Sequence, residues 1–93
     1  MKYSIKFTSQ LKKDFKLAKK QGKNLNKLFD VVDALATGKT LEAKYRDHNL
    51  SGKYSATREC HIEPDWLLVY EIIDESLVLI LYRIGSHAKL FKL

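Results

Sequence analysis

Three histidines lie in the second half of the chain, each beside polar or turn-forming residues. The stretches read Asp47-His48, His61-Ile62-Glu63-Pro64-Asp65-Trp66 and Arg83-Ile84-Gly85-Ser86-His87. Histidine exchanges protons near physiological pH, so His beside Asp and Arg suits proton-transfer chemistry. Phosphodiester cleavage needs a base for the 2′-hydroxyl, an acid for the 5′-leaving oxygen and a fixed cation on the phosphate. The candidate acid–base site therefore consists of His48, His61, Asp65, Arg83 and His87.

The charge distribution points to a polyanionic partner. The 93 residues carry a net charge of +6. Residues 1–53 hold 13 Lys and Arg against 5 Asp and Glu, and residues 54–93 hold 4 against 6, which together give the 17 and 11 of the whole chain. A basic surface attracts phosphate backbones, with RNA as the first candidate, although a merely solvated lysine-rich helix face explains the same pattern.

Composition sets further bounds. The length suits one domain with a modest core. No apolar run reaches the roughly 18 residues of a membrane span, and the first residues lack the apolar segment of a signal peptide. The single cysteine, Cys60, excludes an internal disulfide. These features predict a cytoplasmic protein with no membrane partner.

The first half of the chain predicts a strand and two helices. Residues 3–7 alternate as a half-buried strand does. A helix follows, capped by Thr8 or Ser9 and stopped at Gly22, and a second runs from an Asn24 cap to Gly38. The predicted buried positions are Leu11, Phe15 and Ala18 in the first helix and Leu25, Leu28, Val32 and Leu35 in the second. The short link between the helices predicts an antiparallel hairpin.

The second half predicts a sheet. Residues 39–53 form a polar connector without a strong period. Strands are expected over residues 54–62, 66–73 and 77–83, with a turn at 63–65, and a last short element packs through Leu90 and Phe91. The order β-α-α-β-β-β predicts an α+β fold in which a helix hairpin covers one face of a mainly antiparallel sheet. The other face would be open to a ligand.

Other interpretations of these residues remain open. A histidine can satisfy local backbone groups, Arg83 can reach solvent from a strand end, and Asp65 can be a plain turn residue. Trp66 and Phe91 are more often core residues than base-stacking platforms. A metal site is not expected, because the histidines lack zinc-ligand spacings and Cys60 faces away from His61 in a strand. With four glycines the chain has no glycine-rich phosphate loop.

Three motifs resemble a known family. They are residues 45–52 with Asp-His-x-Leu-x-Gly, residues 58–66 with His-x-Glu-Pro-Asp-Trp, and residues 83–91 with Arg-x-Gly-x-His-x-x-Leu-Phe. Together they resemble the YafQ-like branch of the RelE toxin superfamily. The resemblance covers nearly the whole chain and implies a single toxin domain over residues 1–93. It implies a RelE-like fold and a toxin of a type II toxin–antitoxin system that cleaves mRNA on the ribosome.

The resemblance also implies roles and partners. His48, His61, Asp65 and His87 would be the acid–base set, and Arg83 would hold the phosphate. Which member is acid and which is base does not follow from the resemblance; our own expectation is His87 as general acid and Asp65 or another histidine as base. Trp66 and Phe91 would orient or stack the substrate. The basic helix face, including Lys12, Lys13 and Lys16, would contact ribosomal RNA. The implied partners are mRNA, an acidic antitoxin and, through the antitoxin complex only, operator DNA, with no cofactor and no metal.

Two rival functions remain at this point. A non-catalytic nucleic-acid-binding module, such as a co-repressor with vestigial toxin activity, would bind tightly without cutting RNA. A pure interaction protein would dock an acidic partner through its helix hairpin and tolerate replacement of the histidines.

Overall fold

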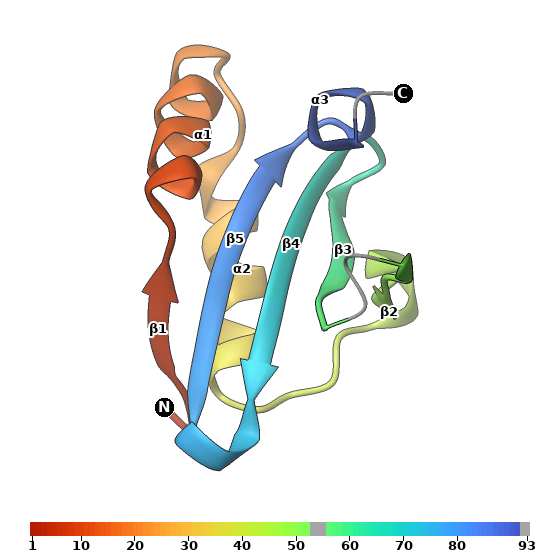
Figure 1. Cartoon of the computed structure of the whole chain (residues 1–93). Helices are drawn as coiled ribbons and strands as arrows, with labels where there is room; N and C mark the ends of the chain where they lie inside the picture. The colour runs from red at the N-terminus through yellow and green to blue at the C-terminus, as the bar shows by residue number, and fades with distance from the viewer. Residues whose placement is uncertain (53–55, 92–93) are drawn as a thin grey trace.

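The computed structural model describes residues 1–52 and 56–91 (Figure 1). Its elements are β1 (Ser4–Phe7), α1 (Ser9–Lys20), α2 (Leu25–Ala36), β2 (His48–Asn49), β3 (Arg58–Glu63), β4 (Trp66–Ile73), β5 (Val78–Gly85) and α3 (His87–Phe91). Two 3-10 turns, η1 (Ala43–Tyr45) and η3 (Asp74–Ser76), precede β2 and join β4 to β5. In this part of the chain the strands form one sheet of order β1-β5-β4-β3-β2. The β1–β5 pair is parallel and the other pairs are antiparallel, which confirms the predicted α+β class.

The two long helices start at the predicted caps. The side chain of Thr8 accepts a hydrogen bond from the backbone N–H of Leu11 at 3.0 Å, and that of Asn24 accepts from Asn26 at 3.1 Å. Both caps satisfy N–H groups that have no partner within the helix. The resulting hairpin covers one face of the sheet (Figure 1).

The main core lies between this hairpin and the sheet. Leu11 and Ala18 of α1 and Leu28 and Leu35 of α2 are buried there, as predicted. Val31 is also fully buried, whereas Val32 only packs against the edge of the core. Phe15 and Leu25 are likewise only partly buried, so three of the seven predicted positions pack against the core without being enclosed in it. For Val32 the fully buried position is the preceding residue. None of the helices within the described ranges is long and apolar enough to cross a membrane.

The face of the sheet turned away from α1 and α2, here named the second face, is partly covered. Leu67 and Val69 of β4 are buried on it beneath Leu90 of α3, and Leu50 packs against the same cluster. Helix α3 lies over the end of the sheet where β5 finishes (Figure 1). The expectation of an open second face is therefore wrong in part, because the last short element is a helix that folds back over it.

The predicted connector contains a strand. Residues 48–49 form β2, which pairs antiparallel with β3, so His48 lies on a sheet edge and not in an irregular loop. The carboxylate of Asp47 accepts hydrogen bonds from Tyr70 and, at 2.8 Å, from Arg58. These contacts fix β2 to β3 and β4. Residues 54 and 55 of the predicted strand 54–62 lie outside the described residues, and β3 begins at Arg58.

Candidate active site

Strand register gathers the predicted chemistry on the second face. Residues paired across neighbouring strands share a face of the sheet. One row of partners on this face, here named the cross-strand row, consists of His48, Glu59, Val69 and Arg83. Since neighbouring strands lie about 4.8 Å apart, the backbone positions of this row span roughly 14 Å. A parallel row places His61 opposite Leu67, one step closer to α3.

A buried carboxylate connects two of the histidines. The side chain of Glu59 is only 5% exposed, and its Oε1 lies 3.7 Å from Nε2 of His48 and 3.5 Å from Nε2 of His61. His48 is exposed at the sheet edge, whereas His61 is half-buried. The structure therefore brings His48 and His61 together around one acid.

Backbone carbonyls orient both rings. Nδ1 of His48 lies 2.7 Å from the carbonyl oxygen of Arg46, and Nδ1 of His61 lies 3.0 Å from that of Pro64. A carbonyl oxygen only accepts, so each Nδ1 must carry the hydrogen that it donates. Nε2 is then the nitrogen that gains or loses a proton, and on both rings it is the nitrogen turned toward Glu59.

The start of α3 holds the third histidine and the predicted aspartate. A carboxylate oxygen of Asp65 accepts a hydrogen bond from the backbone N–H of His87 at 3.0 Å. The imidazole of His87 is exposed and packs against the ring of Phe91, with centroids 4.9 Å apart. Asp65 thus fixes the backbone of His87, and Phe91 fixes the ring.

Arg83 is held by a carboxylate of α1. Its Nε and Nη2 donate to the two oxygens of Asp14 at 2.9 and 3.0 Å. The same carboxylate accepts from the backbone N–H of Ile84 at 3.2 Å and lies 3.5 Å from Nζ of Lys89. Burial alone would raise the pKa of Asp14, but hydrogen bonds from Arg83, Gln10 and Ile84 outweigh it and hold that pKa below its ordinary value.

Asp14 also completes the edge of the sheet. Strand β1 ends at Phe7, so the last residues of β5 have no neighbouring strand on that side. The backbone N–H of Thr8 donates to the carbonyl oxygen of Leu81, and its hydroxyl donates to that of Tyr82. Further along β5, the backbone N–H of Ile84 donates to the carboxylate of Asp14. The cap and first half of α1 therefore take the place of a neighbouring strand and bring the carboxylate of Asp14 to Arg83.

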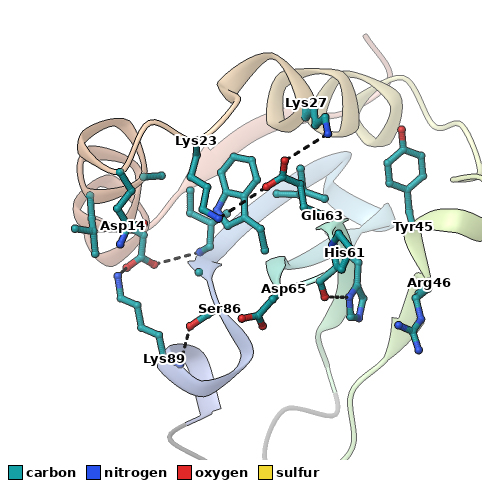
Figure 2. Close-up of a pocket in the computed structure, with 18 of the residues that line it drawn as sticks. Asp14, Lys23, Lys27, Tyr45, Arg46, His61, Glu63, Asp65, Ser86 and Lys89 are labelled. Carbon is teal, nitrogen blue, oxygen red and sulfur yellow. Dashed lines mark hydrogen bonds and ion pairs between the residues drawn. The ribbon is translucent and has the colours of Figure 1, made fainter.

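A cavity of about 1000 Å³ opens where the helix hairpin meets the β3–β4 turn (Figure 2). His61 and Asp65 both line it, together with Lys89 and the buried Asp14. At its roof Nζ of Lys23 and Lys27 lie 3.8 and 3.3 Å from the carboxylate of Glu63. These bridges tie the hairpin to the end of β3.

The structure argues against base stacking by Trp66, whereas its predicted orienting role stays a prediction. Its side chain belongs to the main core and is 2% exposed, with Nζ of Lys23 5.6 Å from the ring centroid. A base cannot stack on a ring with so little accessible surface. Trp66 supports the wall of the cavity, because the strand that begins at this residue turns it inward.

The predicted basic helix face lies apart from these groups. Lys12, Lys13 and Lys16 are all exposed on α1, whose opposite side packs against the core. They do not line the cavity described above. Their predicted contact with RNA stays a prediction.

Cys60 faces the core, on the opposite side of β3 from Glu59 and His61. Burial, assisted by the carboxylates of Asp47 and Glu59, raises the pKa of its thiol to about 12. A thiol in that state is a poor nucleophile. Within residues 1–52 and 56–91, no group of three or more His, Cys, Asp and Glu side chains is arranged to hold a metal ion.

Sequence reasoning missed Asp14 and Glu59. Asp14 sits within a run of lysines that reads as a solvated helix face, although it falls on the buried stripe of Leu11 and Ala18. Glu59 alternates with Cys60 and Ile62, so it shares the face of His61. That alternation was the signal that could have revealed it.

Fold and site together define a small basic α+β protein with an acid–base cluster at one end of its sheet. The sequence model of the family described as the bacterial toxin of type II toxin–antitoxin system, YafQ, matches residues 3–92. The chain belongs to this family.

Individual relatives agree with that assignment. The mRNA interferase toxin YafQ of Escherichia coli (strain K12) is 41% identical over 88 residues, which are 94% of each chain. The crystal structure of the E. coli DinJ-YafQ toxin–antitoxin complex matches with a TM-score of 0.88 and 39% identity over 98% of this chain and 99% of that one. The crystal structure of a metal-bound toxin from Helicobacter pylori gives a TM-score of 0.90 and 44% identity over 96% and 99% of the two chains.

Proposed function

We propose that this protein is an mRNA interferase, a single toxin domain over residues 1–93 that cleaves mRNA on the translating ribosome. The observation that carries the proposal is the cross-strand row, which sets His48, Glu59 and Arg83 on one face of the sheet. Helix α3, which begins at His87, packs over the same face through Leu90. The relatives named mRNA interferase support the same activity.

The chemistry follows from the groups at hand. A base removes the proton from the 2′-hydroxyl, whose oxygen attacks the neighbouring phosphorus. The bond from phosphorus to the 5′-oxygen breaks, and an acid protonates that oxygen, which leaves a 2′,3′-cyclic phosphate and a 5′-hydroxyl. Arg83 stabilises the charge that develops on the phosphate oxygens, and Asp14 orients its guanidinium for that task.

His87 is the proposed general acid because its ring is exposed to solvent at the start of α3 and is held there against Phe91. The base is Asp65 or one of the two histidines beside Glu59. A buried carboxylate stabilises the charge of an imidazole that has taken up a proton, which favours the pair His48 and His61. Both rings turn Nε2 toward the same carboxylate oxygen, so we assign the base to the pair.

The proposed partners match the charge of the protein. Lys12, Lys13 and Lys16 would contact ribosomal RNA through its phosphates, so ribosome binding should weaken as salt rises. An acidic antitoxin would neutralise the toxin, as the DinJ-YafQ complex suggests, and operator DNA would be bound only through that complex. We expect this to take place in the bacterial cytoplasm.

The cleavage is proposed to need no metal ion. The protein groups named above supply the general acid, the general base and the cation that stabilises the charge on the phosphate. A transition-metal chelator that leaves ribosomal magnesium in place should therefore not reduce cleavage. Loss of cleavage with the chelator and recovery with added metal would overturn this point.

The test of the function compares wild type with His87→Ala, and Asp33→Asn serves as the control because Asp33 is exposed on α2. In a translation mixture, wild type and control should produce mRNA fragments that end in 2′,3′-cyclic phosphate. His87→Ala should cut at least about 100-fold more slowly while its circular dichroism spectrum stays unchanged. Equal cutting by both would remove His87 from the mechanism, and tight RNA binding without any products would favour the non-catalytic module.

A further inference from the structure

A groove of about 510 Å³ continues along the second face from the cross-strand row. At the end of the groove nearest α3 it is lined by Val69 and Arg83 of that row, next to Leu90 and Phe91 of α3. Glu71 and Tyr82 line its lower part. Glu71 follows Val69 by two residues on β4, so it faces the same side and lies about 7 Å further along the strand.

A β-bulge builds this groove. Val69 pairs with Arg83 and Tyr70 with Leu81, so Tyr82 is an extra residue of β5 without a partner on β4. A bulge turns side chains that would otherwise alternate between faces. As a result Tyr82 and Arg83, although consecutive, both line the groove, and an aromatic ring stands beside the phosphate-binding arginine.

The bulge also lets Tyr82 hold the carboxylate of Glu71. The tyrosine hydroxyl donates to Oε1 of Glu71 at 2.7 Å. This hydrogen bond, assisted by burial, raises the pKa of Tyr82, so the hydroxyl stays protonated and remains a donor. Oε2 of Glu71 has no hydrogen-bond donor among the described residues. The half-buried carboxylate thus presents one oriented acceptor to the groove.

We propose that this groove is a base-reading subsite in which Glu71 selects the nucleotide next to the scissile phosphate. Single-stranded RNA is commonly recognised by stacking its bases on aromatic rings and bonding their Watson–Crick edges. Tyr82 and Phe91 supply the rings, Arg83 holds the adjoining phosphate and Glu71 meets the edge of the base. The volume is suitable for a single base with its sugar.

A carboxylate discriminates between bases by the donors they present. Adenine, cytosine and guanine each carry an exocyclic amino group that can donate to Oε2 of Glu71. Uracil carries carbonyl oxygens on both sides of its one N–H, and these repel the carboxylate. Glu71 therefore favours the three amino-bearing bases and rejects uracil at this position. A single well-placed contact of this kind discriminates by roughly 5- to 150-fold.

The inference rests on the proposed ribonuclease function, and Glu71→Gln separates the two. Glutamine keeps the size of the side chain and the acceptor for Tyr82, but it adds an N–H₂ donor that a uracil oxygen accepts. A set of mRNAs that differ in one nucleotide of a single codon is cleaved in a translation mixture, and the rate is measured for each base at each codon position. Glu75→Gln, which removes an equal charge from the exposed turn after β4, is the matched control.

Wild type and Glu75→Gln should cut the uracil substrate at least about 5-fold more slowly than the adenine substrate at one codon position. Glu71→Gln should bring the two rates within about twofold while cleavage at adenine continues. An unchanged preference in Glu71→Gln, an equal loss of rate at all bases, or a wild type without any preference would each overturn the inference. If wild type cleaves nothing, the proposed function fails. The subsite is then tested by binding, because wild type should bind a short adenine-containing RNA at least about 5-fold more tightly than a uracil-containing one, and Glu71→Gln should bind the two within about twofold.

Discussion

Two carboxylates that folding removes from water, Asp14 and Glu59, stand on opposite sides of the site, and their partners differ in kind. Asp14 is bound by the guanidinium of Arg83, by a backbone N–H and by the ammonium of Lys89. Glu59 faces two imidazole rings at 3.5 and 3.7 Å. One carboxylate is surrounded by fixed positive charge, whereas the other meets groups that are charged only when they hold a proton.

This difference assigns different work to the two acids. Arg and Lys keep their charge throughout the pH range in which proteins are folded, so the environment of Asp14 is constant. Such a cluster stabilises and orients, and here it fixes α1, the end of β5 and α3 against one another. The environment of Glu59 changes with each proton that a histidine takes up or releases. Glu59 is therefore suited to the proton-transfer step and Asp14 to the architecture around it.

Replacement of Asp14 should have the largest effect on stability. Asp14→Asn removes the charge but not the volume, and it leaves Arg83 and Lys89 without their anion. Asp14 is fully buried, but Arg83 and Lys89 keep about a third of their side chains in contact with solvent, so we expect a loss of about 1–3 kcal/mol in the free energy of unfolding. Urea denaturation followed by circular dichroism measures the loss.

Asp33→Asn serves as the control for Asp14→Asn because it removes an exposed charge from α2 and should change that free energy by less than about 0.5 kcal/mol. If Asp14→Asn is as stable as wild type, Asp14 and its cationic partners do not stabilise the fold, and the structural role assigned to them is wrong.

Replacement of Glu59 should instead reduce catalysis. Glu59→Gln keeps the side-chain volume and removes the negative charge that faces Nε2 of His48 and His61. We expect kcat/KM for mRNA cleavage to fall about 10- to 100-fold, below the effect of losing an acid or base outright, with the free energy of unfolding unchanged within about 1 kcal/mol. Glu75→Gln, which removes an equal charge from the exposed turn after β4, is the control. If Glu59→Gln cleaves at the wild-type rate, Glu59 has no role in catalysis. If it loses as much unfolding free energy as Asp14→Asn, its role is structural. Either result would contradict the difference proposed between the two acids.

The sequence predicted the fold where local signals and long-range packing agree. Thr8 and Asn24 cap the long helices at the expected positions, and the turn at Pro64 starts the β3–β4 hairpin. Sequence patterns did not predict the elements that form only because distant parts of the chain contact each other. Strand β2 has two residues and exists because β3 and the Asp47 contacts with Tyr70 and Arg58 hold it. The parallel pairing of β1 with β5 joins residues more than 70 positions apart and has no local signature.

The candidate site shows the same division. The residue types and motifs indicated His48, His61, Asp65, Arg83 and His87, and the alternating pattern of β3 places His61 on the second face. The partners of these groups were hidden. Asp14 lies 69 residues from Arg83, and the bulge that turns Tyr82 and Arg83 to one face arises only when β5 pairs with β4. Trp66 differs in another way. The sequence motif indicated it as a site residue, but only packing determines how much of its ring is exposed.

The acid dependence of stability supplies the finest test of the comparison. The pKa of Asp14 is held below its ordinary value in the folded state, so the unfolded chain takes up the proton first as the pH falls. The stabilisation from Asp14 is fully present above the ordinary aspartate pKa of about 3.9 and is lost as the pH falls through the lower, folded value. The gap in unfolding free energy between wild type and Asp14→Asn should therefore stay constant from about pH 7 to pH 5 and narrow below about pH 4. Urea titrations across this range measure it, with Asp33→Asn expected to run parallel to wild type. A gap that closes near neutral pH would mean that the partners of Asp14 lose their charge there, which guanidinium and ammonium groups do not do.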